Sequence, residues 1–255
     1  MSSDSPVAEE VCWQAAPESL TLDHGVVHIW RARLDIAPEL RFGLLSEDEQ
    51  RRAKAFHFSL HRDRYIARRR FLRTVLGRYL TRPPQEIQFG YTAYGKPYLP
   101  GAAGWDLKFN LSHAEDLAVC AISLTLDVGI DVAAERLIPD VLELATNHFS
   151  EAETAAVRAA SPERRSAIFL AIWTRKEAYL KGIGTGLSTP LGAFSVPMLP
   201  FGAVQIRGAD GKFTGSRWFV SEIPAPARYL GAVATPASAF RVRLFSLGWP
   251  GSALG

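Results

Sequence analysis

Two acidic residues and one lysine in this chain are spaced so that their side chains could act together on a phosphate. Glu177 and Lys181 occur in the segment WTRKEAYLKGIGTGL, and Asp131 occurs in GIDVA. Residues four apart on a helix share a side, so Glu177 and Lys181 should point the same way. Side-chain alternation along an expected strand puts Asp131 on the opposite face from its apolar neighbours. Taken singly, a surface ion pair and an inert edge acid are the simpler explanations. Together, the two carboxylates suit a Mg²⁺ that keeps several waters and takes its other oxygens from phosphate.

Neutral polar groups gather in two further segments. FNLSHAED brings Asn110, Ser112 and His113 together at what we expect to be a turn. Hydroxyl, amide and imidazole groups suit phosphate oxygens, although a single histidine in a turn is more often a surface residue. In GKPYLP, the Gly-Lys-Pro order predicts a stiff turn that carries Lys96.

The basic residues are distributed unevenly. Residues 51–82 contain eleven Arg or Lys residues and one acid, Asp63. On a helix, Arg62, Arg69 and Arg73 fall near one face. The simpler interpretation of such a run is a solvated helix face. The alternative is a binding surface for a phosphate ligand, an acidic protein or a nucleic acid, and composition does not choose among them.

An internal repeat indicates how these segments are organised. LSEDEQRRAKAF, with Ser46, resembles FSEAETAAVRAA, with Ser150, at an offset of 104 residues. Each Ser-x-x-Glu is a capping box that predicts the start of a helix, and glycines near the far ends (Gly77 in the first half, Gly184 or Gly182 in the second) predict helix stops. LAVCAISL and YLGAVAT read as matching buried strands. We therefore predict an α+β fold of two similar halves related by pseudo-twofold symmetry, residues 1–124 and 125–255, with the active site in the cleft between them.

Composition sets the broad class of the protein. The chain has 255 residues, of which 47% are hydrophobic and 22% are charged, as in ordinary globular proteins. The opening MSSDSPVAEE lacks the features of a secretory signal, and no apolar run approaches the roughly 18 residues of a membrane span. Cys12 and Cys120 form neither a disulfide framework nor a zinc site. We therefore expect a cytoplasmic protein that does not enter a membrane.

The ordered segments GKPYLP, FNLSH, GIDV, FSEAE and WTRKEAYLKGIGTGL resemble the 4′-phosphopantetheinyl transferases of the surfactin-synthetase-activating (Sfp) type. The resemblance covers roughly residues 45–190. It implies an enzyme that moves the 4′-phosphopantetheine arm of coenzyme A to a serine of an apo acyl or peptidyl carrier protein, releasing adenosine 3′,5′-bisphosphate. It implies Mg²⁺ as the cofactor, coenzyme A and the carrier as partners, no nucleic acid, and a monomeric pseudo-dimer.

The resemblance also assigns roles to residues. Asp131 and Glu177 would hold Mg²⁺, and Glu177 or a water that it orients would take the serine proton. Lys181 would meet the phosphates and, with Glu177 and His113, form the catalytic group. The residues expected to contact coenzyme A are Arg62, Tyr91, Lys96, Asn110, Ser112, His113, Lys176 and Lys181.

One position departs from the family pattern. Many members read Gly-x-Asp-x-Glu, but here the second acid is replaced by Ala133. A non-catalytic module that binds coenzyme A or a carrier protein is therefore an alternative function. Keeping Asp131, Glu177 and Lys181 together argues against it, since binding alone would not need all three. A nucleic-acid binder is a third class, and the basic run lacks the interleaved aromatic residues of a stacking platform.

Overall fold

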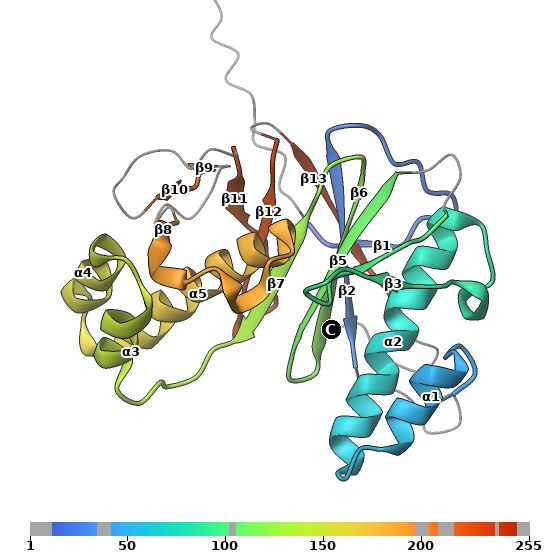
Figure 1. Cartoon of the computed structure of the whole chain (residues 1–255), viewed down its shortest axis with the longest axis horizontal. Helices are drawn as coiled ribbons and strands as arrows, with labels where there is room; N and C mark the ends of the chain where they lie inside the picture. Colours follow the sequence, from blue (N-terminus) through green and yellow to red (C-terminus); the bar gives the residue numbers. More distant parts are fainter. Residues whose placement is uncertain are drawn as a thin grey trace, which may run out of the picture.

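The computed structural model describes residues 12–34, 42–101, 106–196, 204–208, 217–237 and 240–248. The prediction about the first ten residues falls outside this part of the chain. Two sheets stand side by side in the centre of the molecule, with α1 and α2 at one end and α3, α4 and α5 at the other (Figure 1). The first sheet has the order β1-β13-β2-β6-β5. Its strands are β1 (Gln14–Ala15), β2 (Val26–Arg33), β5 (Leu107–Ala114), β6 (Leu117–Leu124) and β13 (Arg241–Ser246).

The second sheet has the order β7-β12-β11-β9. Its strands are β7 (Gly129–Ala134), β9 (Val204–Gln205), β11 (Phe219–Glu222) and β12 (Tyr229–Thr235). Two short pairs lie apart from the sheets: β3 (Gly90–Tyr91) with β4 (Pro97–Tyr98), and β8 (Phe194–Ser195) with β10 (Arg207–Gly208). The helices are α1 (Glu47–Lys54), α2 (Ser59–Leu80), α3 (Val141–His148), α4 (Glu151–Ala159) and α5 (Pro162–Ile183). The described residues also form the 3₁₀ turns η2 (Pro84–Glu86), η3 (Gly186–Ser188) and η4 (Leu191–Ala193).

The predicted α+β fold of two similar halves is confirmed by the order of the elements. The strands β2, β6 and β5 of the first half correspond to β7, β12 and β11 of the second. The helix pair α1–α2 corresponds to α4–α5, and α2 and α5 have 22 residues each. The division at residue 124 stays a prediction, since β13 crosses it to pair in parallel with β2 in the first sheet.

The predicted glycine stops are only partly right. Gly184 ends α5 in the left-handed conformation, with φ of 73°, as glycine favours. Gly77 lies inside α2, which continues to Leu80, and Thr81 takes the left-handed cap with φ of 50°. A side chain at Gly77 would come within 2.9 Å of the Arg82 carbonyl oxygen, so the glycine serves close packing there.

A buried ion pair occurs at the same place in both halves. In the first half, Glu49 accepts a hydrogen bond from the Ser46 backbone at 3.2 Å and another from Arg73 Nε at 2.7 Å. The other end of Arg73 donates to the carbonyl oxygens of Pro84, the first residue of η2, and Ile87, which follows η2. One charged pair thus fastens a helix start, a long helix and a 3₁₀ turn to one another.

The second half repeats this arrangement around Glu153. Its carboxylate accepts from the Ser150 backbone at 2.9 Å and pairs with Lys176 Nζ at 2.8 Å. Lys176 Nζ also donates to the carbonyl oxygens of Leu191, the first residue of η4, and Phe194, which follows η4. Lys176 is fully buried. Each half therefore contains a buried cation at this place, Arg73 in the first half and Lys176 in the second. The pattern of charges in the sequence would predict both at the surface.

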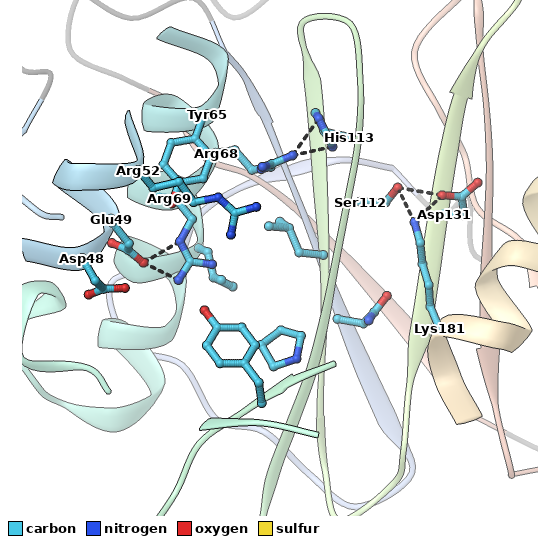
Figure 2. A pocket seen from close by; sticks show the side chains of 15 residues that line it. Asp48, Glu49, Arg52, Tyr65, Arg68, Arg69, Ser112, His113, Asp131 and Lys181 are labelled. Atoms are coloured by element: carbon cyan, nitrogen blue, oxygen red, sulfur yellow. Dashed lines mark hydrogen bonds and ion pairs between the residues drawn. The ribbon is translucent and has the colours of Figure 1, made fainter. Parts of the chain in front are cut away.

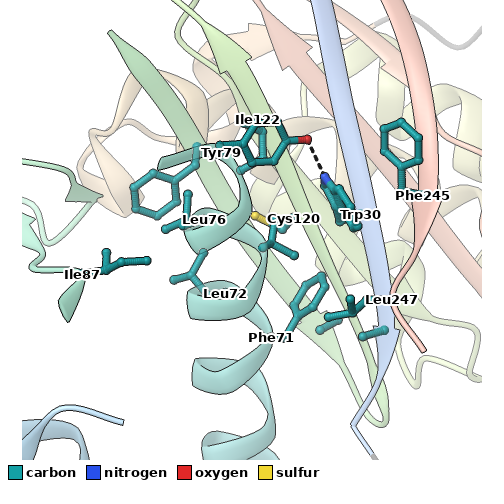
Figure 3. Packing of buried hydrophobic residues seen from close by; sticks show 14 of the residues in the cluster. Trp30, Phe71, Leu72, Leu76, Tyr79, Ile87, Cys120, Ile122, Phe245 and Leu247 are labelled. Atoms are coloured by element: carbon teal, nitrogen blue, oxygen red, sulfur yellow. Dashed lines mark hydrogen bonds between the residues drawn. The ribbon is translucent and has the colours of Figure 1, made fainter. Parts of the chain in front are cut away.

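The described residues form four apolar clusters, of which the smallest joins α1 to α2 through Ala53, Tyr65 and Ile66, and the other three are larger. The first lies between α2 and the first sheet and includes Trp30, Phe71 and Leu76 (Figure 3). The second lies between α5 and the second sheet. The third contains Ile29 from β2 and Ile130 from β7, so it joins the two sheets. The halves therefore share a dry interface, and burial there favours their association at roughly 25 cal/mol for each Å² of apolar surface.

Replacing Lys176 with Met should lower the free energy of unfolding by about 3 kcal/mol, because Glu153 would stay buried without its cation. Urea denaturation measures the loss. Lys54→Met, at an exposed lysine of α1, is the matched control and should change stability by less than about 0.5 kcal/mol. Adding Glu153→Gln to Lys176→Met should recover part of the loss. Equal stability of the Lys54 and Lys176 variants would contradict this account of the pair.

Candidate active site

The two sheets meet along β5 and β7, and side chains rather than backbone groups join these edges. Asn110 Oδ1 accepts a hydrogen bond from the Ile130 backbone N–H at 3.0 Å. Ser112 Oγ accepts from the Val132 backbone N–H at 3.4 Å. Exposed strand edges carry unpaired backbone groups, and these two side chains satisfy them here. The segment FNLSHA was predicted to be a turn, which is wrong: it belongs to strand β5, and the turn begins at Glu115.

A charged cluster lies on the β7 side of this junction (Figure 2). Lys181 Nζ is 2.6 Å from Asp131 Oδ1 and 2.9 Å from Ser112 Oγ. The Ser112 hydroxyl donates to the same Asp131 oxygen at 2.7 Å. Asp131 is buried, as is Ser112, whereas the Lys181 side chain is 30% exposed. A strand of each half and helix α5 therefore deliver one carboxylate, one hydroxyl and one ammonium to a single point.

Glu177 lies one helical turn before Lys181 and interacts electrostatically with the same cluster. Burial, then the negative charge of Asp131, raises the pKa of the Glu177 carboxyl above its usual value, and Lys181 partly offsets this. Glu177 makes no hydrogen bond or ion pair with any of the residues described. The two carboxylates are therefore close enough to repel each other, with one ammonium between them.

Glycines bring α5 close enough to β7 for this contact. A Cβ at Gly129 would lie 2.0 Å from the Ala178 carbonyl oxygen and 2.3 Å from the Gly182 nitrogen. A Cβ at Gly182 would lie 2.4 Å from the Trp218 ring. Any larger residue at these positions would push the helix from the strand. The glycines at Gly129 and Gly182 thus set the distance between Asp131 and Lys181.

His113 lies on the opposite wall, beside helix α2 (Figure 2). The Arg68 guanidinium donates to the imidazole and is 2.7 Å from Nε2. Partial desolvation, followed by the positive charges of Arg68, Lys181 and Arg64, lowers the pKa of His113 from 6.5 to about 4. The imidazole is therefore neutral at pH 7, and the cations around it favour an anion in the space between them.

A cavity of about 440 Å³ connects these two walls. Among the residues of the described chain that line it are Asp48, Glu49, Arg52, Tyr65, Arg68, Arg69, Leu72, Tyr91, Asn110, Ser112, His113, Asp131 and Lys181. Tyr65 lies between two guanidinium groups, with Arg52 at 5.8 Å and Arg68 at 5.5 Å from its ring centre. The cavity thus has a cationic wall on α1 and α2 and a carboxylate-bearing wall on β7.

Four of the expected site residues are not among those that line this cavity: Glu177, which lies one helical turn before Lys181, and three cations. Lys176 is a correction, because its ammonium is buried against Glu153 and two carbonyl oxygens. Lys96 Nζ donates a hydrogen bond to the Gly182 carbonyl oxygen at 2.5 Å. This oxygen is near the carboxyl end of α5, where helix carbonyls attract a cation. Arg62 pairs with the neighbouring Asp63 at 3.0 Å.

Several cavity residues were not singled out as site residues from the sequence, among them Arg52, Tyr65 and Arg68. Tyr65, Arg68 and Leu72 follow helical spacing along α2, and that spacing was the available signal. The basic face was assigned instead to Arg62, Arg69 and Arg73. Arg69 and Arg73 are buried and bonded to Glu49, so the solvated-face interpretation is wrong for both of them.

Comparison with known proteins now decides the family. The 4′-phosphopantetheinyl transferase superfamily matches residues 127–234, and the 4′-phosphopantetheinyl transferase N-terminal family matches residues 36–125. The 4′-phosphopantetheinyl transferase HetI of Nostoc sp. (strain PCC 7120) is 36% identical over 227 residues, covering 87% of this chain and 92% of its own. The chain belongs to the 4′-phosphopantetheinyl transferase superfamily. The 4′-phosphopantetheinyl transferase Sfp of Bacillus subtilis (strain 168) is 30% identical over 166 residues, covering 65% of this chain and 72% of its own.

Membership in this superfamily confirms the resemblance seen in the sequence motifs. It supports phosphopantetheinyl transfer over the alternative of a binding module without activity. No helix among the described residues is long and apolar enough to cross a membrane.

The residues of this transferase fit a divalent cation by their chemistry. Glu177 and Asp131 are electrostatically coupled carboxylates, and a cation between them would relieve their repulsion. Within the described ranges there is no group of three or more His, Cys, Asp and Glu side chains that could hold a metal. Two protein carboxylates with water and phosphate oxygens would complete the shell that Mg²⁺ prefers.

Arg68→Met should raise the pKa of His113 from about 4 toward 6.5, because removing a neighbouring positive charge stabilises the imidazolium. NMR titration of the His113 ring measures the pKa. Arg62→Met is the matched control on the same helix and should leave the titration unchanged. If His113 has the same pKa in the Arg68 variant and in the unsubstituted protein, Arg68 has no electrostatic effect on His113. That result would contradict the described contact.

Proposed function

We propose that this transferase moves the 4′-phosphopantetheine arm of coenzyme A to a serine of an apo acyl or peptidyl carrier protein, with Mg²⁺ as cofactor. The observation that carries the proposal is the cluster of Asp131, Lys181 and Ser112, with Glu177 beside it, at one wall of a cavity whose other wall is cationic. Phosphoryl transfer needs alignment and charge neutralisation more than covalent help, and these groups supply both.

Coenzyme A phosphates are suited to the cationic side of the cavity. Arg52 and Arg68 line it, and Lys181 faces them from α5. The neutral His113 imidazole can hydrogen-bond a phosphate oxygen, and a bound phosphate would favour its protonated form because opposite charges attract. We place the nucleotide phosphates along this wall. Tyr91 from β3 stands at the rim, with 55% of its surface exposed.

Asp131 and Glu177 would hold Mg²⁺ against the diphosphate. When bound, the ion supplies positive charge to the diphosphate and to the oxygen that leaves with the adenosine bisphosphate. In the structure the Lys181 ammonium donates a hydrogen bond to Asp131 Oδ1. It can turn toward a phosphate because 30% of its side chain is exposed. Ser112 would keep Asp131 in position throughout, through its hydrogen bond.

The carrier serine would attack the phosphorus that bears the pantetheine arm. A new bond forms between this phosphorus and the serine oxygen, and the bond to the bridging oxygen of the diphosphate breaks. Glu177, or a water that it orients, would take the serine proton. The bridging oxygen departs on adenosine 3′,5′-bisphosphate.

The carrier protein is the macromolecular partner in this proposal, and no nucleic acid or membrane is needed for the reaction. The expected cytoplasmic location and monomeric state stay predictions. A monomer suffices chemically, since strands β5 and β7 and helices α2 and α5 of one chain already supply both walls of the cavity.

Asp131→Asn and Glu177→Gln should each lower the transfer rate by about a hundredfold or more, because each removes a charge that positions the ion. The assay incubates apo acyl carrier protein with coenzyme A and Mg²⁺ and follows the added mass of the arm. Glu151→Gln, at an exposed glutamate of α4, is the matched control. A nearly unchanged rate in Asp131→Asn at saturating Mg²⁺ would remove Asp131 from the metal site. A lack of arm transfer to any apo carrier by the unsubstituted enzyme would overturn the function itself.

Ala133→Glu should lower the Mg²⁺ concentration needed for the half-maximal rate. Residues two apart on a strand share a face, so position 133 lies beside Asp131 on β7, and Ala133 is partly exposed there. An added carboxylate would give the ion one more protein ligand. Titration of Mg²⁺ at saturating coenzyme A and carrier measures the midpoint, with Ala134→Glu on the opposite face as the control. An unchanged midpoint in an active Ala133 variant would show that this position does not face the metal.

A further inference from the structure

A second cavity, of about 520 Å³, lies at the other edge of the first sheet. Strand β13, His28 of β2 and the chain around residues 17–21 form its walls, and it shares no lining residue with the active-site cavity. Its polar lining groups include His28, Arg243, Ser19 and Thr21, and none of the described residues that line it is acidic. Asp23, outside this lining, acts electrostatically on His28 more weakly than Arg243 does. The transfer reaction makes no use of this space.

His28 carries an unmet hydrogen-bond donor at this cavity. The indole of Trp30 can only donate, and it donates to the Tyr79 hydroxyl at 2.7 Å (Figure 3). The hydroxyl in turn lies 2.8 Å from His28 Nδ1. Because the hydroxyl oxygen accepts from Trp30, its own proton is available for Nδ1, and the neutral ring then carries its hydrogen on Nε2. That nitrogen is buried and has no hydrogen-bond partner in the described chain.

Arg243 stands next to this donor. His28 and Arg243 are direct partners on the parallel strands β2 and β13, so their side chains share one face of the sheet. Arg243 is exposed, and no described residue hydrogen-bonds to it or forms an ion pair with it. A buried polar atom without a partner is costly unless a ligand or water satisfies it. An N–H donor beside a guanidinium matches one anionic group with two oxygens.

We propose that this cavity binds a small carboxylate at His28 and Arg243. One guanidinium and one neutral N–H balance a single negative charge, which favours a monocarboxylate over a phosphate dianion. Leu20 and Phe245 line the cavity beside these groups, and their apolar side chains suit a short alkyl chain. The site is independent of the proposed transfer chemistry.

Butyrate is the probe for this site, and the full-length transferase is the protein. Long-range ¹H–¹⁵N NMR spectra should show His28 of the free protein protonated on Nε2. Addition of butyrate should shift the His28 nitrogens in a saturable way. The neutral alcohol 1-butanol has a similar shape and should produce no saturable shift. Inorganic phosphate should bind less tightly than butyrate.

Arg243→Met should weaken butyrate binding by about tenfold or more, as expected for the loss of a charged hydrogen-bond partner. Arg241→Met is the matched control, since Arg241 is an exposed arginine of the same strand that does not line the cavity. Three results would overturn the proposal: no saturable shift with butyrate, equal binding by the Arg243 and Arg241 variants, or His28 protonated on Nδ1. Phosphate binding as tight as butyrate would overturn the carboxylate assignment.

Discussion

The active site depends on how the edges of β5 and β7 are joined. Adjacent strands usually meet through a ladder of backbone hydrogen bonds, but here Asn110 and Ser112 reach the backbone of β7 with their side chains. A backbone ladder would leave no room for a polar side chain between the edges. Because Ser112 stands in that place, its hydroxyl also holds Asp131 and Lys181. The Ser112 hydroxyl thus belongs both to the junction between the halves and to the centre of the site.

The two halves share their internal anchors and differ in what they present to the cleft. Each half fastens its long helix with a buried pair, Glu49 with Arg73 and Glu153 with Lys176. Toward the cleft, the first half offers arginines on α1 and α2, whereas the second half offers the carboxylates and Lys181. A duplicated unit therefore keeps its stabilising charges inside each copy. The charges toward the cleft differ between the copies, since arginines outnumber acids on the first side and a carboxylate stands beside Lys181 on the second, which suits one cleft to both an anionic nucleotide and a cation.

Much of the fold could be predicted from the sequence, because the relevant signals are local. The strands β6 and β12 are continuous apolar runs, and both capping boxes mark true helix starts. Asp131 stands opposite Ile130 and Val132, as strand alternation requires. Strand β5 was read as a turn because its polar residues look like loop residues. Their backbone ladder with β6 makes them strand residues. Their polar side chains bond to β7, which comes later in the chain.

Charged residues limited the prediction of the site for a similar reason. Lys176 and Arg73 look like surface residues, since burying a charge is costly unless a partner of opposite sign lies beside it. The partners, Glu153 and Glu49, also serve as helix caps, and capping alone explains why a glutamate occurs there. Arg68 was overlooked because its significance depends on His113, which approaches from another strand. Spacing along one helix shows which residues share a face, but it does not show what that face meets.

The last described strand has a consequence for how the protein is made. Strand β13 pairs with β2 in the first sheet, although more than two hundred residues separate them in the chain. As the chain leaves the ribosome, β2 can pair with β6 long before β13 exists. One side of β2 must therefore wait, unpaired, until the second half has been synthesised. Proteins are made from the amino end, so the half that begins first is completed last. A chain cut between the halves would lack β13, and its first sheet would be without that strand.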